Sequence, residues 1–264
     1  TLINQGKRNL DLREAIVSGR LKHPNIVRTV DSFQLQDGRT VNAEDYVQGV
    51  SLRSAIRTTG PITNRDRLRR LFLPVIDALK EADLEGILHR DIKPSNILIP
   101  ENQKGALITD WQNAAFKRDM QNLTIPTRGG TKYAHPILLN GLLNGDPVKA
   151  SNETEIYSLG ATLYEAITGE SLFDYTLSEQ ESGRRIRIGE REFTVGLQSG
   201  NQTLEEISLK DLEKQLRESL KKIPKEMSRL RKLIYNMMTT DEKSKTRRHS
   251  WSMSKVFSEF DRAT

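Results

Sequence analysis

The stretch from His89 to Ile99, HRDIKPSNILI, sets three polar residues immediately before an apolar run. Asp91, Lys93 and Asn96 stand at the mouth of a predicted strand, and Asp110 ends the next apolar run, ALITD. A hairpin between the two runs would bring Asn96 and Asp110 together at one end. An amide oxygen and a carboxylate oxygen that converge in this way form the kind of site that Mg²⁺ prefers.

Asp91 and Lys93 supply the remaining groups that a phosphoryl-transfer site needs. The Asp91 carboxylate is separate from the metal site and could orient a hydroxyl group and accept its proton. Lys93 places a cation near the transferring phosphoryl group, and this chemistry depends on positioning and charge neutralisation. The alternative interpretation is a loop whose Asp and Asn side chains only cap local backbone.

Apolar patterning predicts a small unit at the N-terminal end of the chain. Residues 11–22 carry an apolar stripe with helical spacing. Residues 26–47 read as two β-rich runs around Asp37–Gly38, which is a favoured hairpin turn. One helix and two strands are therefore expected before residue 48.

Longer helices are expected to surround the catalytic stretch. Residues 60–86 predict a helix opened by Thr63 and kinked at Pro74, followed by the short strand at 96–99. Residues 111–144 have no periodicity, which is typical of a functional connection. The remaining predicted elements are a helix over 151–169 closed by Gly169, a hairpin over 185–195, and helices over 203–238 and 250–262.

Composition excludes several classes of protein. The 264 residues are 36% hydrophobic and 29% charged, which is typical of a globular domain and leaves no run of about eighteen apolar residues for a membrane span. The absence of cysteine excludes disulfides, thiolate zinc sites and cysteine nucleophiles. The net charge of +6 comes from scattered Lys and Arg, which argues for solvated faces and against a nucleic-acid stripe. We expect a cytoplasmic protein.

HRDIKPSN resembles the catalytic loop H-R-D-x-K-P-x-N of eukaryotic-type serine/threonine protein kinases at every specified position. Asp110 stands at the metal-binding Asp of the D-F-G motif, although this chain reads DWQ. GGTKYAHPI is similar to the GTxxYxxPE end of the activation segment. EIYSLGATLYEAITGE is similar to the core helix DVWSLGxxLYELLTGE of the large lobe. The resemblance covers residues 11–170 well and the remainder loosely.

Two upstream segments also resemble this family. REAIVSGRLKHPNIV is similar to the helix whose glutamate pairs with the ATP-positioning lysine, which makes Glu14 the matching residue. DYVQGVSL is similar to the hinge, so Asp45 and Val47 are the implied nucleotide contacts.

The resemblance implies an α+β, protein kinase-like two-lobed fold. Residues 1–48 would be a remnant of the small lobe, with the C-helix and two strands, and residues 49–264 the mainly helical large lobe. The implied function is transfer of the ATP γ-phosphoryl group, with Mg²⁺, to Ser or Thr hydroxyls of protein substrates.

The implied site residues fall into four groups. The catalytic residues are Asp91, Lys93, Asn96 and Asp110, of which Asn96 and Asp110 are the metal ligands. The nucleotide contacts are Glu14, Asp45, Val47, Asn96 and Asp110. The regulatory residues are Arg90, which would bind a phosphorylated activation segment, and Thr124, Thr127 and Thr131, which are candidate phosphorylation sites.

The sequence departs from the family pattern most clearly at its start. The Gly-rich loop and the strand carrying the ATP-positioning lysine would precede Glu14, where only Thr1 to Leu10 stand. Lys7 adjoins the predicted helix and reads as a solvated lysine. Two explanations remain open: the sequence lacks an upstream segment, which the missing initial Met favours, or the natural protein is a shortened relative that no longer needs that segment. The alternative function is that of a pseudokinase, a scaffold without turnover.

Single substitutions also depart from the pattern. Trp111-Gln112 replaces Phe-Gly, and the glutamine lacks the backbone freedom of glycine. Ile137 replaces a glutamate, and Lys245 stands where its partner arginine is expected. Glu155 replaces the aspartate of the core helix. Glu44 aligns with the gatekeeper, where a carboxylate must be paired or half exposed, unless the register is shifted by one.

Overall fold

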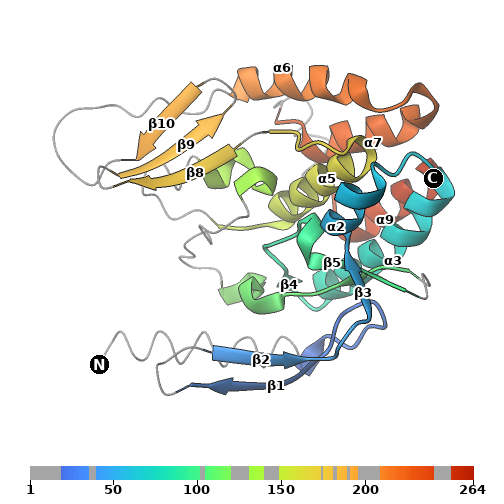
Figure 1. The fold of residues 1–264 in the computed structure, drawn as a ribbon, viewed down its shortest axis with the longest axis vertical. Helices are drawn as coiled ribbons and strands as arrows, with labels where there is room; N and C mark the ends of the chain where they lie inside the picture. The colour runs from blue at the N-terminus through green and yellow to red at the C-terminus, as the bar shows by residue number, and fades with distance from the viewer. Residues whose placement is uncertain are drawn as a thin grey trace.

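The computed structural model describes residues 19–35, 40–101, 105–119, 131–139, 149–173, 175–180, 183–188, 191–195, 209–240 and 251–264. Figure 1 shows a helical body in the upper part of the view and a two-stranded ribbon, β1–β2, below it. Of the predicted helix over 11–22, only its end at Gly19 and Arg20 lies within the described residues, and these two are helical.

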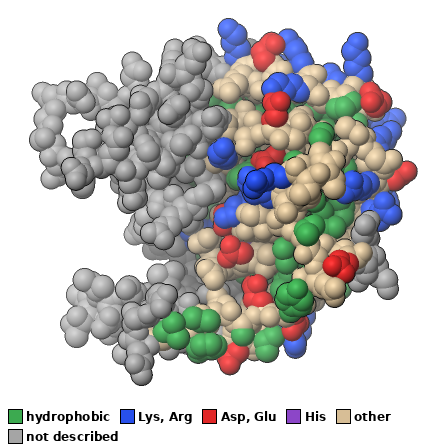
Figure 2. Space-filling model, viewed as in Figure 1, with side chains coloured by type: hydrophobic (Ala, Val, Ile, Leu, Met, Phe, Trp, Pro, Cys, Tyr) green, Lys and Arg blue, Asp and Glu red, His purple; other side chains and the backbone are tan. Residues whose placement is uncertain are grey.

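The ribbon consists of β1 (Thr29–Gln34) and β2 (Thr40–Glu44), which pair antiparallel as the sequence predicted. The turn Asp37–Gly38 lies outside the described residues. Phe33 on β1 is 49% exposed, and Figure 2 shows apolar side chains gathered over this lower end of the molecule.

The segment before β1 connects this ribbon to the hairpin that ends just before Asp110. The Val27 amide donates to the carbonyl of Ile108 at 2.9 Å, and the Ile108 amide donates to the carbonyl of Asn25 at 2.8 Å. Residues 25–27 therefore run beside the strand that leads to Asp110.

Strands β5 (Ile97–Pro100) and β6 (Leu107–Ile108) form this hairpin. Together with β3 (Gly49–Ser51) they make a three-stranded sheet of order β3-β5-β6. The strand predicted at 96–99 begins one residue later because residues 94–96 form a 3₁₀ turn. Gly49 is required here, since a Cβ atom would lie 2.2 Å from the carbonyl oxygen of Ile99. A second small sheet pairs β4 (Ile87–Leu88) with β7 (Ala115–Phe116).

The first helices of the body are α2 (Leu52–Thr59) and α3 (Arg65–Leu84). The prediction that Thr63 opens the long helix is wrong by one residue. Asn64 is the N-cap, because its side chain accepts a hydrogen bond from the Arg67 amide at 2.8 Å.

The most hydrophobic predicted helix is α5 (Asn152–Thr168), which ends at Gly169 in the left-handed region, φ 78°, as predicted. Figure 1 shows it near the centre of the helical body. Its residues Leu159 and Leu163 are fully buried, and Gly160 allows Met238 of α7 to approach within 2.7 Å of where a Cβ atom would stand. Helix α5 is therefore a central part of the hydrophobic core.

The predicted helix over 203–238 is interrupted. Its described part forms α6 (Leu209–Ser219), two 3₁₀ turns and α7 (Ser228–Met238), because Pro224 disfavours helical backbone at the residue before it. The last helix is α9 (Met253–Ala263). The predicted hairpin forms as β9 (Gly183–Ile188) and β10 (Arg191–Val195), joined by a further strand, β8 (Tyr175–Gln180).

None of the helices in the described ranges combines the length and hydropathy that crossing a bilayer requires. On the face shown in Figure 2, Lys and Arg are interspersed with Asp and Glu over the helical body.

Candidate active site

The catalytic loop connects β4 to β5 and lies against the hairpin that ends at Asp110. Ile97 pairs with Ile108 and Leu98 with Leu107, and the Thr109 amide donates to the carbonyl of Asn96 at 3.0 Å. This ladder places Asn96 directly beside Thr109, one residue before Asp110. The hairpin predicted from the sequence is confirmed.

Asp91 is the centre of a hydrogen-bonded cluster. Its Oδ2 atom accepts from Lys93 Nζ at 2.5 Å and from Asn96 Nδ2 at 3.1 Å, and Asn96 Nδ2 also donates to the Asp91 carbonyl at 2.9 Å. Asp91 is 9% exposed and Asn96 5% exposed. The other carboxylate oxygen, Oδ1, accepts no hydrogen bond from the residues that the structure describes, so it can accept one from a substrate hydroxyl.

Asn96 and Asp110 have the oxygen atoms that a divalent cation requires. Because Asn96 Nδ2 donates to Asp91, Oδ1 is turned away from that carboxylate, and among the described residues its one hydrogen-bond donor is Ser95 Oγ at 3.3 Å. Asp110 adopts a left-handed conformation, φ 66° and ψ 62°, and is half-buried. Within the described ranges, no three His, Asp or Glu side chains form a metal cluster. Two protein oxygens with water and phosphate oxygens fit the coordination of Mg²⁺.

Glu155 of α5 holds the start of the catalytic loop. Its Oε2 atom accepts from the His89 amide at 2.8 Å, and its Oε1 atom accepts from the Arg90 amide at 2.6 Å. Burial raises the pKa of Glu155 to about 7, and the two amide donors partly oppose that shift. The longer side chain that replaces the family's aspartate thus reaches two backbone donors, one of them on Arg90, which has φ 67°.

His89 was not selected as a site residue from the sequence, although it opens the quoted motif. Its Nδ1 atom accepts from the Asp91 amide at 3.2 Å, and its Nε2 atom lies 3.0 Å from the Thr109 carbonyl. A carbonyl can only accept, so Nε2 carries the proton and the ring is neutral. Burial lowers the pKa of His89, which is consistent with this state.

Trp111 fills a buried aromatic position beside the catalytic loop. It is 2% exposed, and its ring centroid lies 4.5 Å from that of His89. This burial agrees with the expectation that tryptophan can fill an aromatic position here, and its equivalence to the phenylalanine of the family stays a prediction. Gln112 is exposed in the 3₁₀ turn that follows Asp110.

The hinge residues have mixed environments. The Asp45 carboxylate is exposed and accepts two hydrogen bonds from Arg28, at 3.0 and 3.2 Å, and the nucleotide contact expected of this residue stays a prediction. The side chain of Val47 is half-buried. Glu44 is exposed, and its Oε2 atom accepts from Thr109 Oγ1 at 2.9 Å. The Glu44 carboxylate, which was expected to be paired or half exposed, is therefore both hydrogen-bonded and exposed.

Several residues named in the sequence analysis lie outside the described residues. These are Lys7, Glu14, Thr124, Thr127 and Lys245. Thr131 opens a 3₁₀ turn over 131–133, and its side chain is not among those described. Arg90 is half-buried, and its regulatory role stays a prediction. Ile137 is 51% exposed, so no buried cation is required beside it.

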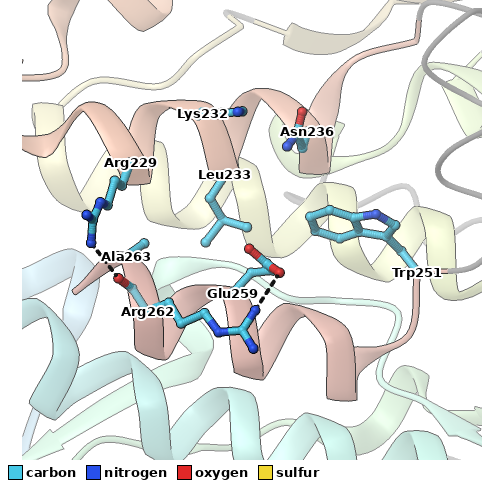
Figure 3. A pocket seen from close by; sticks show the side chains of 8 residues that line it. All are labelled: Arg229, Lys232, Leu233, Asn236, Trp251, Glu259, Arg262 and Ala263. Carbon is cyan, nitrogen blue, oxygen red and sulfur yellow. Dashed lines mark hydrogen bonds and ion pairs between the residues drawn. The ribbon is translucent and has the colours of Figure 1, made fainter.

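A separate groove of about 320 Å³ lies between α7 and α9. Figure 3 shows Arg262 paired with Glu259 along one side and Arg229 directed to the Arg262 backbone. None of the catalytic-loop residues lines it, so it is not part of the candidate site.

Comparison with known proteins agrees with this geometry. A family model described as Protein kinase domain matches residues 3–256, which extends well beyond the range of clear resemblance in the sequence. The serine/threonine-protein kinase PknK of Mycobacterium tuberculosis (strain H37Rv) is 35% identical over 178 residues, which are 67% of this chain and 15% of that protein.

Two other relatives give the same picture. The serine/threonine-protein kinase PknB of Mycolicibacterium smegmatis is 34% identical over 170 residues, 61% of this chain and 25% of that protein. The serine/threonine-protein kinase PrkC of Bacillus subtilis is 33% identical over 163 residues, 61% of this chain and 24% of that protein. The chain therefore spans a quarter or less of the length of these curated relatives. Since the family model matches nearly all of its residues, the chain belongs to the protein kinase domain family.

Proposed function

We propose that the protein transfers the γ-phosphoryl group of ATP to Ser or Thr hydroxyls of protein substrates. The observation that carries this proposal is the buried cluster of Asp91, Lys93 and Asn96, held at the end of the hairpin that leads to Asp110. The serine/threonine kinases to which the chain is similar support the choice of acceptor.

Each residue of the cluster has a separate role in the transfer. The open Oδ1 atom of Asp91 orients the substrate hydroxyl and receives its proton as the new O–P bond forms and ADP leaves. Lys93, already held by Asp91, neutralises charge on the phosphoryl group. Asn96 Oδ1 and the Asp110 carboxylate would hold Mg²⁺, which neutralises phosphate charge when it is bound.

We place the small lobe at residues 1–48 and the large lobe at 49–264, with the nucleotide between them, against the backbone of Asp45 and Val47 and beside Glu14. Arg90 would receive a phosphorylated Thr124, Thr127 or Thr131. Since the reaction uses the ATP pool of the cell, the proposal places this domain in the cytoplasm.

A scaffold without turnover is the second candidate, and Gln112, which stands where the family's D-F-G motif has glycine, favours it. A scaffold has no need for the Asp91 cluster. Measurement of phosphate transfer separates the two.

The test is the substitution Asp91→Asn in the complete protein. It keeps the size of the side chain and removes the proton acceptor, so the rate of phosphate transfer should fall by about 10²- to 10⁴-fold while the melting temperature is unchanged. Asp66→Asn makes the same chemical change at an exposed site at the start of α3 and should retain full activity. Activity retained by Asp91→Asn would overturn the assignment, and a wild-type protein that binds ATP without transfer would favour the scaffold.

A further inference from the structure

Thr109, the residue before Asp110, uses all of its polar groups, and each bond reaches another segment. Its amide donates to the Asn96 carbonyl at 3.0 Å. Its carbonyl accepts from His89 Nε2 at 3.0 Å. Its hydroxyl donates to Glu44 Oε2 at 2.9 Å. Thr109 therefore joins the catalytic loop twice through its backbone and strand β2 once through its side chain.

The acceptor on β2 is held in place by its neighbours. Glu44 is the last residue of β2 and pairs with Thr29 of β1. The next residue, Asp45, donates its amide to the Arg28 carbonyl at 2.9 Å and forms an ion pair with the same arginine. Within the part of the chain that the structure describes, Thr109 is the only side-chain hydrogen-bond partner of Glu44.

Asp110 depends on such external contacts more than an ordinary residue does. Its φ of 66° lies in the left-handed region, which residues with a Cβ atom adopt infrequently, although aspartate tolerates it better than most of them. Its carboxylate accepts no hydrogen bond from the described residues, so the backbone is what limits the positions that this carboxylate can reach. The bonds of Thr109 are the nearest constraints on that backbone.

We propose that Glu44 and Thr109 form a hydrogen-bonded latch between β2 and the hairpin β5–β6, and that this latch positions Asp110 for Mg·ATP. The inference rests on the proposed function, because Asp110 is the metal ligand there. Glu44 and Thr109 are positioning residues that act through Asp110. A carboxylate acceptor makes this bond stronger than one between neutral groups, which accounts for glutamate at the gatekeeper position.

The first experiment compares Thr109→Val with Thr109→Ser in the complete protein. Valine keeps the shape and removes the hydroxyl, whereas serine keeps the hydroxyl and removes a methyl group. In Mg²⁺, the Kd for ATP should rise about tenfold with valine and stay within about twofold with serine. Without Mg²⁺ the three proteins should bind ATP alike, because the latch acts through the metal ligand. Equal weakening by both variants, or equal weakening with and without Mg²⁺, would overturn the proposal.

A double-mutant cycle tests the partner. Glu44→Ala should weaken Mg·ATP binding as much as Thr109→Val does, and Thr109→Val should have no further effect when Glu44 is already Ala. Glu44→Gln keeps an acceptor oxygen and should restore most of the affinity. Additive effects of the two substitutions would show that the side chains do not act as a pair.

Hydrogen exchange without nucleotide separates the latch from the proposed function. The Thr109 amide is bonded to Asn96, so its exchange reports how firmly this segment is held. We expect faster exchange at residues 107–111 with Thr109→Val than with Thr109→Ser. If the wild-type protein neither binds nor uses ATP, the proposed function is wrong. If amide exchange in the valine variant equals that of the wild-type protein, the latch is wrong, whatever the outcome for ATP.

Discussion

Asp91 shows how the local chemistry depends on the orientation of a single carboxylate. Lys93 and Asn96 donate to the same oxygen, Oδ2, which leaves Oδ1 without a hydrogen-bond donor among the described residues. Charge-assisted bonds to one oxygen fix the rotamer of a side chain without neutralising both of its acceptor sites. At the residue scale, the catalytic loop is therefore already arranged for its proposed role.

Glu155 gives a pH-dependent prediction at the same scale. Burial raises its pKa from 4.5 to about 7, so between these values the folded protein keeps a proton that the unfolded chain has released. The free energy of unfolding should therefore fall as pH rises through this window, by on the order of 3 kcal/mol, and then level off.

Urea unfolding of the wild-type protein and Glu155→Gln, measured from about pH 5 to about pH 8, checks this prediction. Glutamine has no proton to lose in this range, so the difference in stability between the two proteins should shift towards the variant as pH rises. Parallel curves would show that Glu155 does not titrate there.

Helix ends dominate at the element scale, because they decide where each functional segment begins. Ser151 and Thr154 form a reciprocal capping box at the start of α5, and Glu155, the residue after Thr154, accepts hydrogen bonds from the catalytic-loop amides. The start of α3 is set in the same way by Asn64. Short polar side chains thus determine the residue at which each of these helices begins.

The cap of α3 can be tested directly. Asn64→Ala removes the acceptor of the Arg67 amide and should lower the free energy of unfolding by about 1 kcal/mol. Thr63→Ala, one residue earlier, is the matched control and should change little, since Thr63 does not cap the helix. Chemical denaturation of the two variants would show which residue is the cap, and a larger loss in Thr63→Ala would contradict the structure.

At the scale of the whole molecule, one buried tyrosine joins three distant segments. Tyr133 donates to Glu165 of α5 at 2.6 Å and accepts from Arg53 of α2, while Ser158 Oγ donates to its carbonyl at 2.8 Å. Burial and the adjacent carboxylate raise the pKa of Tyr133, so the phenol stays a neutral donor. This network ties the end of the activation segment to the helical core.

Tyr133→Phe removes the donor and leaves the Glu165 carboxylate, 6% exposed, with fewer partners. The free energy of unfolding should fall by about 1–3 kcal/mol. Tyr46→Phe makes the same change at a residue that is 90% exposed and should have almost no effect. Thermal unfolding of both variants checks the prediction, and equal melting temperatures would remove Tyr133 from the core network.

Much of the architecture followed from pattern alone. The spacing of apolar residues predicted the ribbon β1–β2, the helix α5 with its end at Gly169, and the hairpin that brings Asn96 beside Thr109. Two predictions of boundaries were wrong for local reasons: Asn64 competes with Thr63 as a cap, and Pro224 interrupts a periodicity that otherwise continues. The ion pair between Asp45 and Arg28 was not predicted, because no motif connects these two residues.

The sequence by itself determined which functional groups the site can use, because the types and spacing of Asp91, Lys93, Asn96 and Asp110 are properties of the chain. Only the tertiary structure decided which oxygen of Asp91 stays open, that the Glu155 carboxylate receives the catalytic-loop amides, and that the Glu44 carboxylate meets Thr109. A hydrogen bond between residues far apart in the chain requires the donor–acceptor distance to be correct to within a few tenths of an ångström. Such distances arise only after the core has packed, so no spacing within the sequence specifies them.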